Sequence, residues 1–326
     1  MIEILLKEWI EQVKYYIHLI ADYSIKESQV GAVLDDVLNL SGKMLRSKLL
    51  LLCAFLGSNW KNNKEKICKL AAMVELTHLA SLIHDDIVDD SPYRRGKVSV
   101  QGKYGKDAAV FAGDFLIARI FYYGAVENLN EAVSILSKTV EYMCIGEIEQ
   151  DLCRYQEDIS EKKYFENIER KTAALFQAAS YIGAKETGCS EEIIQKLKLF
   201  VKNLGLMFQL KDDILDFTSN SKELGKETHK DFQNGIYTFP VIMALKNLKA
   251  KEVLLPIMRK NKEEKLSLAE ILQLQNYIIQ FGGIEASYEK IKYLSTINRQ
   301  LIKELGQNSK ITVYLEKILN DLEVEN

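Results

Sequence analysis

Aspartates recur with one spacing at two places in this 326-residue chain. The pattern Asp-Asp-x-x-Asp is made first by Asp85, Asp86 and Asp89, and again 127 residues later by Asp212, Asp213 and Asp216. On a helix, residues four apart lie on one face, so the carboxylates of each cluster repel one another unless a cation is bound. Mg²⁺ takes oxygen ligands from one or two carboxylates, from water and from substrate phosphates. One such cluster could be a solvated acidic helix end, but the repetition favours two clusters that face each other and hold several Mg²⁺ ions around a diphosphate.

Basic residues near these clusters are candidates for contacts with phosphate. Lys43 and Arg46 lie at a predicted helix start, Arg94 and Arg95 follow the first cluster, and Lys171 stands on an apolar stretch. Arginine offers a bidentate fork to a phosphate, and lysine offers a point charge. Each of these residues could equally be solvated or could offset nearby negative charge, so both interpretations stay open at this point.

Two apolar runs must position the aspartates. Ile67–Ile83 ends at the first cluster and Leu197–Leu210 ends at the second, and both have helical rather than stranded periodicity. The chain is 47% hydrophobic and contains only 3 prolines and 17 glycines. This composition predicts an all-α protein with a sizeable core.

The rest of the chain also has mainly helical periodicity. We expect further helices over residues 1–23, 30–40, 48–56, 108–125, 132–152, 164–183 and 241–248. We expect Lys97–Asp107 to form a polar loop, and we expect Asp114 to be a lone buried carboxylate. No linker, repeat or low-complexity segment is visible, which predicts a single domain over residues 1–326.

Charge and cysteine content argue against several classes of protein. The net charge is −3 and there is no basic stripe interleaved with aromatics, so we expect no nucleic-acid partner. Five scattered cysteines without a Cys-x-x-Cys pair indicate a reducing, cytoplasmic location. No signal peptide is evident, and the longest apolar run, Leu49–Gly57, is too short to span a bilayer. We therefore expect no stable membrane insertion, although a greasy substrate or product would allow loose contact.

Taken in order, the motifs resemble those of the trans-type polyprenyl diphosphate synthases, and most of all the medium- and long-chain (heptaprenyl and octaprenyl) members. The resemblance covers about Ser41 to Pro240. It is carried by Gly42-Lys43-x-x-Arg46, Glu75-Leu76-x-His78, Asp85-Asp86-x-x-Asp89, Arg94-Arg95-Gly96, Gly113-Asp114, Gln150, Lys171-Thr172, Phe208-Gln209-x-x-Asp212-Asp213-x-x-Asp216 and Lys226.

The resemblance implies a fold and a reaction. The fold would be a single-domain, all-α bundle of the isoprenoid-synthase type around a central cavity, usually as a homodimer. The reaction would condense isopentenyl diphosphate with an allylic diphosphate such as farnesyl or geranylgeranyl diphosphate. The departing diphosphate would take the proton, because no dedicated side-chain base is evident.

The resemblance also implies roles for individual residues, which we assign by their positions in the matching motifs. The six aspartates of the two clusters would hold Mg²⁺, three ions per active site. The allylic diphosphate would meet Arg94, Lys171, Thr172, Gln209 and Lys226. Isopentenyl diphosphate would meet Lys43, Arg46, His78 and Arg95. Both aspartate pairs (Asp85, Asp86, Asp212 and Asp213), Asp89, Lys171 and Gln209 form the expected catalytic set.

Four positions depart from the family pattern. Ser41, Met44 and Ser47 stand where the family commonly has glycine, arginine and proline, and Ile236 replaces a common lysine. The last change removes one diphosphate contact, which we interpret as a character of some long-chain synthases.

Small residues just before the first cluster predict a long product. Short-chain relatives often close the tunnel with an aromatic four or five positions before the first aspartate, where this chain has Ser81 and Ala80. Thr77, one turn earlier in the chain, and Phe115 and Phe121 from the next long helix would then line the tunnel. One helical turn of about 5.4 Å is close to the length of one isoprene unit, so each turn without a large side chain leaves room for a further unit. Because Ala80 and Ser81 are small, we expect products of about C30 to C40.

Three alternatives remain. The first is a short-chain (C20, geranylgeranyl) synthase, and the second is a subunit of a hetero-oligomeric synthase. A class I terpene cyclase is the third, although its second metal motif usually differs from the one seen here.

Overall fold

The computed structural model describes residues 2–22, 28–39, 42–94, 96–218, 230–306 and 310–323. Within these ranges the regular secondary structure is helical apart from one two-stranded antiparallel hairpin, so the all-α prediction is confirmed. The elements form two compact units that interleave along the chain. One contains Met1–Val140, Leu175–Leu199 and Asn308–Ile311, and the other contains Glu141–Ala174, Phe200–Gln307 and Thr312–Asn326. Each unit is described by itself, and the single domain expected over residues 1–326 stays a prediction.

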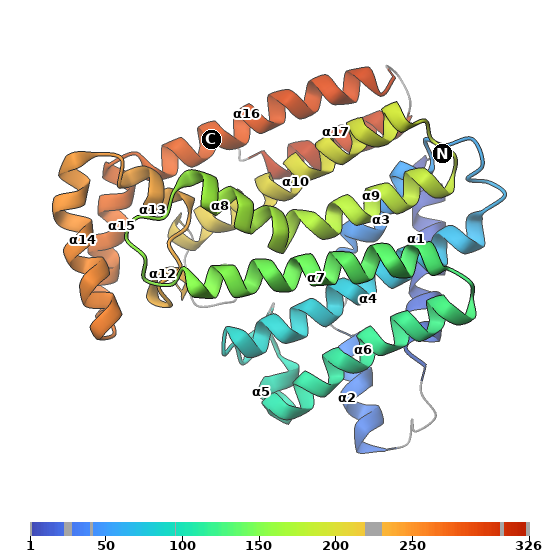
Figure 1. The fold of residues 1–326 in the computed structure, drawn as a ribbon, viewed down its shortest axis with the longest axis horizontal. Helices are drawn as coiled ribbons and strands as arrows, with labels where there is room; N and C mark the ends of the chain where they lie inside the picture. The colour runs from blue at the N-terminus through green and yellow to red at the C-terminus, as the bar shows by residue number, and fades with distance from the viewer. Residues whose placement is uncertain are drawn as a thin grey trace. The chain divides into compact units, whose positions relative to one another are not determined.

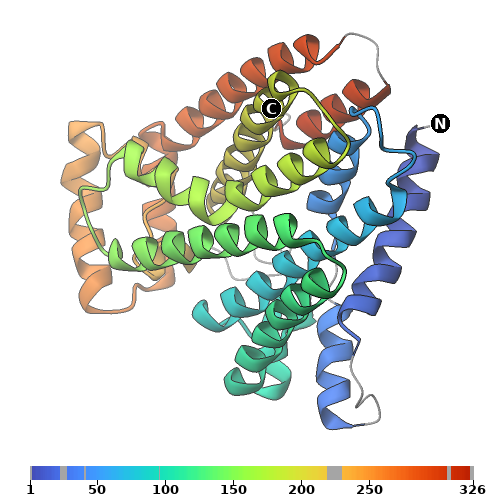
Figure 2. The ribbon, with the colours of Figure 1, turned by 45° about the vertical axis from the view of Figure 1, so that its right-hand side comes forward.

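The first unit is built around α4 (Figures 1 and 2). Its helices are α1 (Ile2–Ile20), α2 (Gln29–Leu38), α3 (Leu45–Ala54), α4 (Lys64–Val88), α5 (Val100–Tyr104), α6 (Lys106–Val126), the start of α7 (Asn130–Leu152), most of α9 (Ala174–Glu186) and the start of α10 (Glu191–Thr218). The strands β1 (Tyr93–Arg94) and β2 (Lys97–Val98) form the hairpin, with Tyr93 opposite Val98. Helices α1, α3 and α6 pack against α4, whose middle is buried on all sides. This burial accounts for its nearly continuous apolar sequence.

The second unit contains the remainder of α7 and α10. Its other helical elements are α8 (Glu161–Ile168), the π-helical turn η1 (Glu169–Ala173), α12 (Lys230–Gln233), α13 (Phe239–Ala244), α14 (Leu248–Glu263), α15 (Leu268–Gln280), α16 (Gly283–Glu304) and most of α17 (Lys310–Leu322). Helix α13 packs against α8, α15 and α16. Phe200, Phe217, Phe232 and Phe239 are fully buried in this unit.

Two expectations about local structure are wrong. Lys97–Asp107 is not a loop: it contains β2, α5 and the start of α6. The Ser99 side chain caps α5 by accepting a hydrogen bond from the Gly102 amide at 3.2 Å, a contact that stabilises so short a helix. Residues 164–183 are not one regular helix either, because η1 inserts a π-helical turn between α8 and α9.

Helices α4 and α6 are long and apolar enough to cross a membrane on length and composition. The apolar window of α4 is 72% buried within the protein, as in the core helix of a compact domain, whereas that of α6 is 39% buried. The expectation of no stable membrane insertion stays a prediction.

Candidate active site

The first aspartate cluster ends α4. Asp86 is buried and accepts a 2.7 Å hydrogen bond from Arg94 Nε on β1, while Asp85 and Asp89 are partly exposed. Asp89 is the C-cap of the helix. The Gln101 side chain also donates to the Asp86 carbonyl over 2.7 Å. The hairpin and α5 therefore fold back onto the end of α4 and hold Asp86 and Arg94 together.

Gly113 marks a close approach of α6 to the same helix end. A Cβ built on Gly113 would lie 2.3 Å from His84 Nε2, so the absence of a side chain makes room for His84. Asp114 Oδ1 lies 3.4 Å from the same nitrogen. The Asp114 side chain is 61% exposed, so the expectation that it is buried is wrong.

Two of the residues predicted to bind isopentenyl diphosphate are in contact near the start of α3. Arg46 Nη1 lies 2.8 Å from His78 Nε2, and the Arg46 guanidinium stacks 4.5 Å from the Phe176 ring centre. Lys43 precedes this helix and is exposed. The structure thus brings Arg46 and His78 together across 32 residues of sequence.

Ser47, one of the departures from the family pattern, has a clear structural role. It is completely buried, and its hydroxyl lies 2.9 Å from Glu75 Oε2 and 3.0 Å from the Ala71 carbonyl oxygen. The buried Glu75 carboxylate therefore has a donor that a proline at position 47 could not supply.

The second cluster lies in the last turns of α10. Asp212 is partly exposed, whereas Asp213 and Asp216 are buried. Asp213 Oδ2 accepts a hydrogen bond from the Tyr164 hydroxyl at 2.6 Å, and Oδ1 accepts one from Gln209 Nε2 at 2.9 Å. Burial raises the pKa of Asp213 to about 7, against the opposing effect of these two hydrogen bonds. Burial and the nearby Asp213 hold the pKa of Tyr164 well above 10.

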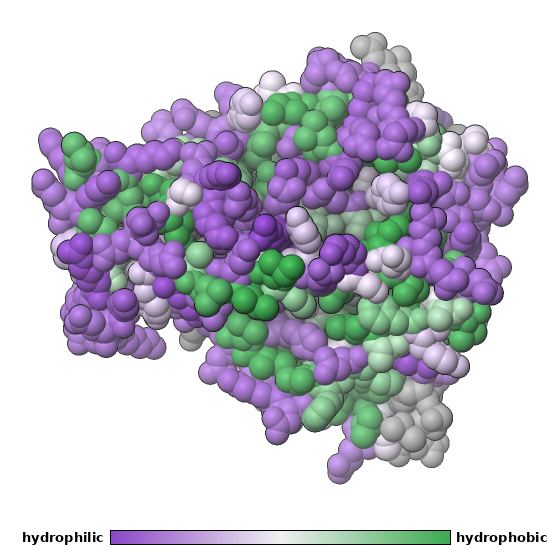
Figure 3. Space-filling model, viewed as in Figure 1, coloured by the Kyte–Doolittle hydropathy of each residue, from purple (hydrophilic) through white to green (hydrophobic). Residues whose placement is uncertain are grey.

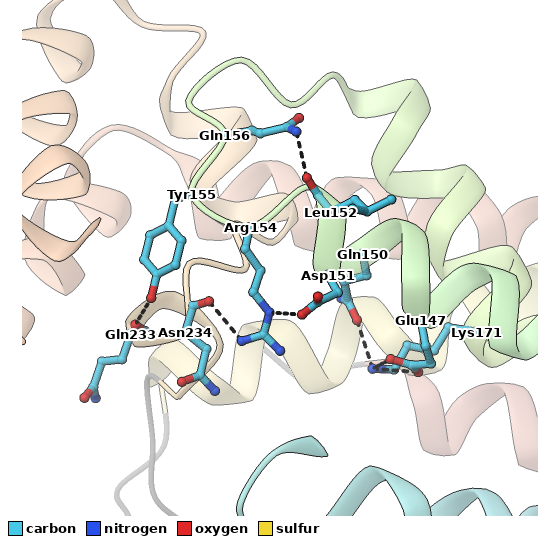
Figure 4. A network of polar contacts seen from close by, with 10 residues as sticks. All are labelled: Glu147, Gln150, Asp151, Leu152, Arg154, Tyr155, Gln156, Lys171, Gln233 and Asn234. Atoms are coloured by element: carbon cyan, nitrogen blue, oxygen red, sulfur yellow. Dashed lines mark hydrogen bonds and ion pairs between the residues drawn. The ribbon is translucent and has the colours of Figure 1, made fainter. Parts of the chain in front are cut away.

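The π-helical turn carries Lys171 and Thr172. Lys171 Nζ lies 2.9 Å from Glu147 Oε1 and donates to Gln150 Oε1 over 3.0 Å (Figure 4). Thr172 donates to Gln209 Oε1 over 2.9 Å, so the turn reaches the second aspartate cluster through Gln209.

A second part of the same network fixes the chain before Ile236. Arg154 Nε lies 2.6 Å from Asp151 Oδ1, and its Nη1 donates to the Asn234 carbonyl over 3.3 Å (Figure 4). The Tyr155 amide donates to the Gly235 carbonyl over 2.8 Å. These contacts tie the end of α7 to the segment that leads into α13.

Two residues of the site were missed from the sequence. Tyr164 lies 49 residues from Asp213 and belongs to no motif, and Glu147 lies within the helix expected over residues 132–152, where it had no assigned role. A charged side chain one turn before Gln150 on the same face is the only signal that pointed to Glu147. Two predicted residues, Arg95 and Lys226, lie outside the described residues.

The residues expected to line a tunnel all belong to the first unit. Thr77 and Ala80 are buried on α4, with Ala80 only 1% exposed, and Ser81 is partly exposed. Phe115 and Phe121 are partly exposed on α6, the helix that packs along α4. The structure therefore places these residues on two packed helices of one unit.

The donor set fits Mg²⁺ in its chemistry. Within the described ranges, no group of three or more His, Cys, Asp and Glu side chains converges on one point. Mg²⁺ usually completes its octahedron with water and substrate phosphates, so one or two carboxylates from a cluster are enough. Asp85, Asp89 and Asp212 are partly exposed and could supply them.

Comparison with known proteins assigns the chain to a family. The family model described as polyprenyl synthetase matches residues 27–275. The chain belongs to the polyprenyl synthetase family. It is 34% identical over 265 residues to heptaprenyl diphosphate synthase component 2 of Geobacillus stearothermophilus, covering 80% of each chain. It is 36% identical over 263 residues to a short chain isoprenyl diphosphate synthase of Methanocaldococcus jannaschii, covering 77% of this chain and 78% of that one.

The same assignment follows from solved structures. A polyprenyl synthase from Caulobacter crescentus, complexed with calcium and isoprenyl diphosphate, superimposes with a TM-score of 0.88 at 28% identity, covering 98% of this chain and 96% of that one. The chain therefore has the all-α isoprenoid-synthase fold, and this polyprenyl synthetase is an enzyme that transfers prenyl groups.

Proposed function

We propose that this polyprenyl synthetase condenses isopentenyl diphosphate with an allylic diphosphate, such as farnesyl or geranylgeranyl diphosphate, in a reaction that depends on Mg²⁺. The observation that carries the proposal is that the two aspartate clusters have a similar arrangement of side chains. Each cluster contains a buried aspartate that protein donors hold: Arg94 holds Asp86, and Tyr164 with Gln209 holds Asp213. Beside it stands a partly exposed aspartate, Asp85 or Asp212.

The charges of these side chains suit ionisation of an allylic C–O bond. Bound Mg²⁺ would act as a Lewis acid that stabilises the negative charge developing on the leaving diphosphate. Asp85, Asp86, Asp89, Asp212, Asp213 and Asp216 would hold about three ions. Arg94, Lys171 and Lys226 would place further positive charge beside the same group.

Arg46 is suited to the second diphosphate. Its guanidinium is oriented by His78 and by the Phe176 ring, which favours a bidentate contact with phosphate over a loosely held charge. Lys43 and Arg95 would supply two more cations. The double bond of isopentenyl diphosphate would then attack the allylic carbon, and the proton lost would go to the departing diphosphate.

We propose a product of about C30 to C40. Ala80 and Ser81 are too small to close a tunnel beside α4, and the Geobacillus relative is named for a heptaprenyl product within this range. A C20 product is the alternative, since the Methanocaldococcus relative is named as a short chain synthase.

The decisive experiment supplies the purified chain with labelled isopentenyl diphosphate, one allylic primer at a time and Mg²⁺, and sizes the products by chromatography. We expect polyprenyl products of C30 to C40 that disappear when EDTA removes the metal. Cyclic hydrocarbons formed without isopentenyl diphosphate would indicate a terpene cyclase and contradict the proposal.

The assembly we propose is a homodimer. Large apolar side chains are exposed on α6, where Phe111 is 71% and Tyr122 62% exposed, and on α7, where Ile148 is 60% and Leu152 71% exposed. Figure 3 shows apolar areas over both helices among hydrophilic surroundings. Exposed apolar patches of this kind commonly mark protein interfaces.

A hetero-oligomer is the alternative, because the Geobacillus relative is named as one component of a synthase. Light scattering of the purified chain, paired with the assay above, separates the two. A dimer that is active alone supports the homodimer, and a chain that is inactive alone supports a need for a second component. We also propose a cytoplasmic location, in keeping with five free cysteines, which cell fractionation would test.

A further inference from the structure

Tyr164 ends a chain of hydrogen bonds that runs through the second aspartate cluster. The Tyr164 hydroxyl donates to Asp213 Oδ2 over 2.6 Å. The other oxygen of Asp213 accepts from Gln209 Nε2 at 2.9 Å, and Gln209 Oε1 accepts from the Thr172 hydroxyl at 2.9 Å. The chain links α8, α10 and η1 within one unit, and it determines which way the Gln209 amide points.

The Tyr164 ring is held firmly. The residue is 6% exposed, and its ring centre lies 5.1 Å from that of Phe165 and 5.4 Å from that of Phe239. A phenol fixed in this way offers a donor of defined direction at little entropic cost. The Asp213 carboxylate is therefore oriented from one side by Tyr164 and from the other by Gln209.

We propose that Tyr164 is a positioning residue, which holds Asp213 and, through it, Gln209 in the orientation in which this cluster receives a diphosphate with its divalent cations. The inference rests on the proposed function, because that function places the diphosphate at the cluster. Tyr164 itself touches neither substrate nor metal, and it acts through the side chain of Asp213.

Removing the hydroxyl isolates this role. Tyr164→Phe keeps the ring and its aromatic contacts but leaves Asp213 Oδ2 without its buried donor. The carboxylate is then held through Oδ1 by Gln209 alone, so its orientation and that of the Gln209 amide are less restricted. Outer partners of metal-binding residues are typically worth 10- to 100-fold in metal affinity. We expect Tyr164→Phe to weaken binding at the cluster by about tenfold.

Calorimetry on the full chain measures the affinity for Mn²⁺ together with inorganic diphosphate. The melting temperature of each variant is measured as well. Tyr237→Phe is the matched control, because Tyr237 is 3% exposed in the same unit and its hydroxyl donates to the Met258 carbonyl over 3.4 Å. Tyr237→Phe should lower the melting temperature while leaving the affinity at the wild-type value. A lower melting temperature with wild-type affinity for Tyr164→Phe would show a merely structural role and overturn the inference.

Thr172→Val tests the chain from its other end. If the hydrogen bonds act as a unit, the double variant with Tyr164→Phe loses less affinity than the product of the two single losses. Independent, multiplicative losses would contradict a connected chain. Failure of the wild type to bind Mn²⁺ with diphosphate would instead count against the proposed function itself.

Discussion

At the scale of single residues, the two aspartate clusters use different donors for one purpose. Asp86 is held by a guanidinium on the hairpin, whereas Asp213 is held by a phenol and an amide. A buried carboxylate without a donor would cost several kcal/mol, so these partners make burial tolerable and fix the carboxylates in direction. Orientation before substrate arrives reduces the reorganisation needed during the reaction.

Arg46 provides a test of orientation at this scale. Arg46→Lys keeps the charge but removes the fork that His78 and Phe176 orient. We expect the KM for isopentenyl diphosphate to rise about tenfold, equivalent to about 1.4 kcal/mol, with the KM for the allylic primer little changed.

Steady-state kinetics with each substrate varied in turn provide the measurement. Arg259→Lys is the control, since Arg259 forms an exposed ion pair with Glu157 and should leave both constants unchanged. An equal rise in both KM values for Arg46→Lys would place Arg46 outside a dedicated isopentenyl site.

At the scale of elements, the long helices could be predicted and the short connections could not. The apolar runs before the aspartate clusters indicate α4 and α10, because burial of a helix determines which residue types its own sequence contains. The middle of α4 is buried on all sides and its sequence is almost continuously apolar. The hairpin and α5 leave none, because contacts such as that of Gln101 with the Asp86 carbonyl stabilise them. The partnership of Tyr164 with Asp213 escaped prediction for the same reason: it joins residues far apart in the chain.

The π-helical turn η1 also depends on packing from outside. A Cβ on Gly146 would lie 2.9 Å from Arg170 Cβ, and one on Gly205 would lie 2.8 Å from Ala173 Cα. Two glycines thus let α7 and α10 approach the turn closely. Such turns act as one-residue insertions in a helix and are frequent at functional sites.

Deleting Arg170 tests whether the turn positions the site. Removal of one residue should restore a regular helix and rotate the residues on either side of the turn by about 100° relative to one another. Lys171 and Tyr164 could then no longer both reach their partners, and we expect turnover to fall at least a hundredfold with helical content unchanged. Arg170→Ala keeps the turn and should retain most activity. Comparable activity in the deletion and the substitution would show that the turn is dispensable.

At the scale of the whole molecule, the fold accounts for the class of reaction but not for product length. Relatives of this chain are named for both short and long products. We therefore predict that product length depends on individual side chains beside α4, such as Ala80 and Ser81 before the first aspartate cluster.

Enlarging those side chains should shorten the product. Ala80→Phe or Ser81→Phe would fill the space beside α4 one turn before Asp85, and we expect products to shift from C30–C40 toward C15–C20. The rate at which isopentenyl diphosphate is consumed, corrected for the shorter chains, should stay within about threefold of the wild-type rate. The substituted residues lie one helical turn, about 5.4 Å, from Asp85, so the aspartates keep their positions. The readout is product size by chromatography. A wild type that stops at C15, or two variants with unchanged product length, would show that these positions do not line the path.

The central claim is that both aspartate clusters serve one metal-dependent reaction. The most direct measurement is the turnover of Asp85→Asn and Asp212→Asn at saturating Mg²⁺, beside Asp90→Asn. Asp90 is an exposed neighbour with a backbone φ of 47° that asparagine tolerates, so its variant should remain active. Loss of a ligand removes several kcal/mol of transition-state stabilisation, so each of the other two variants should lose at least about a hundredfold in turnover while keeping the wild-type melting temperature. Near-normal turnover in either Asp85→Asn or Asp212→Asn would contradict the claim.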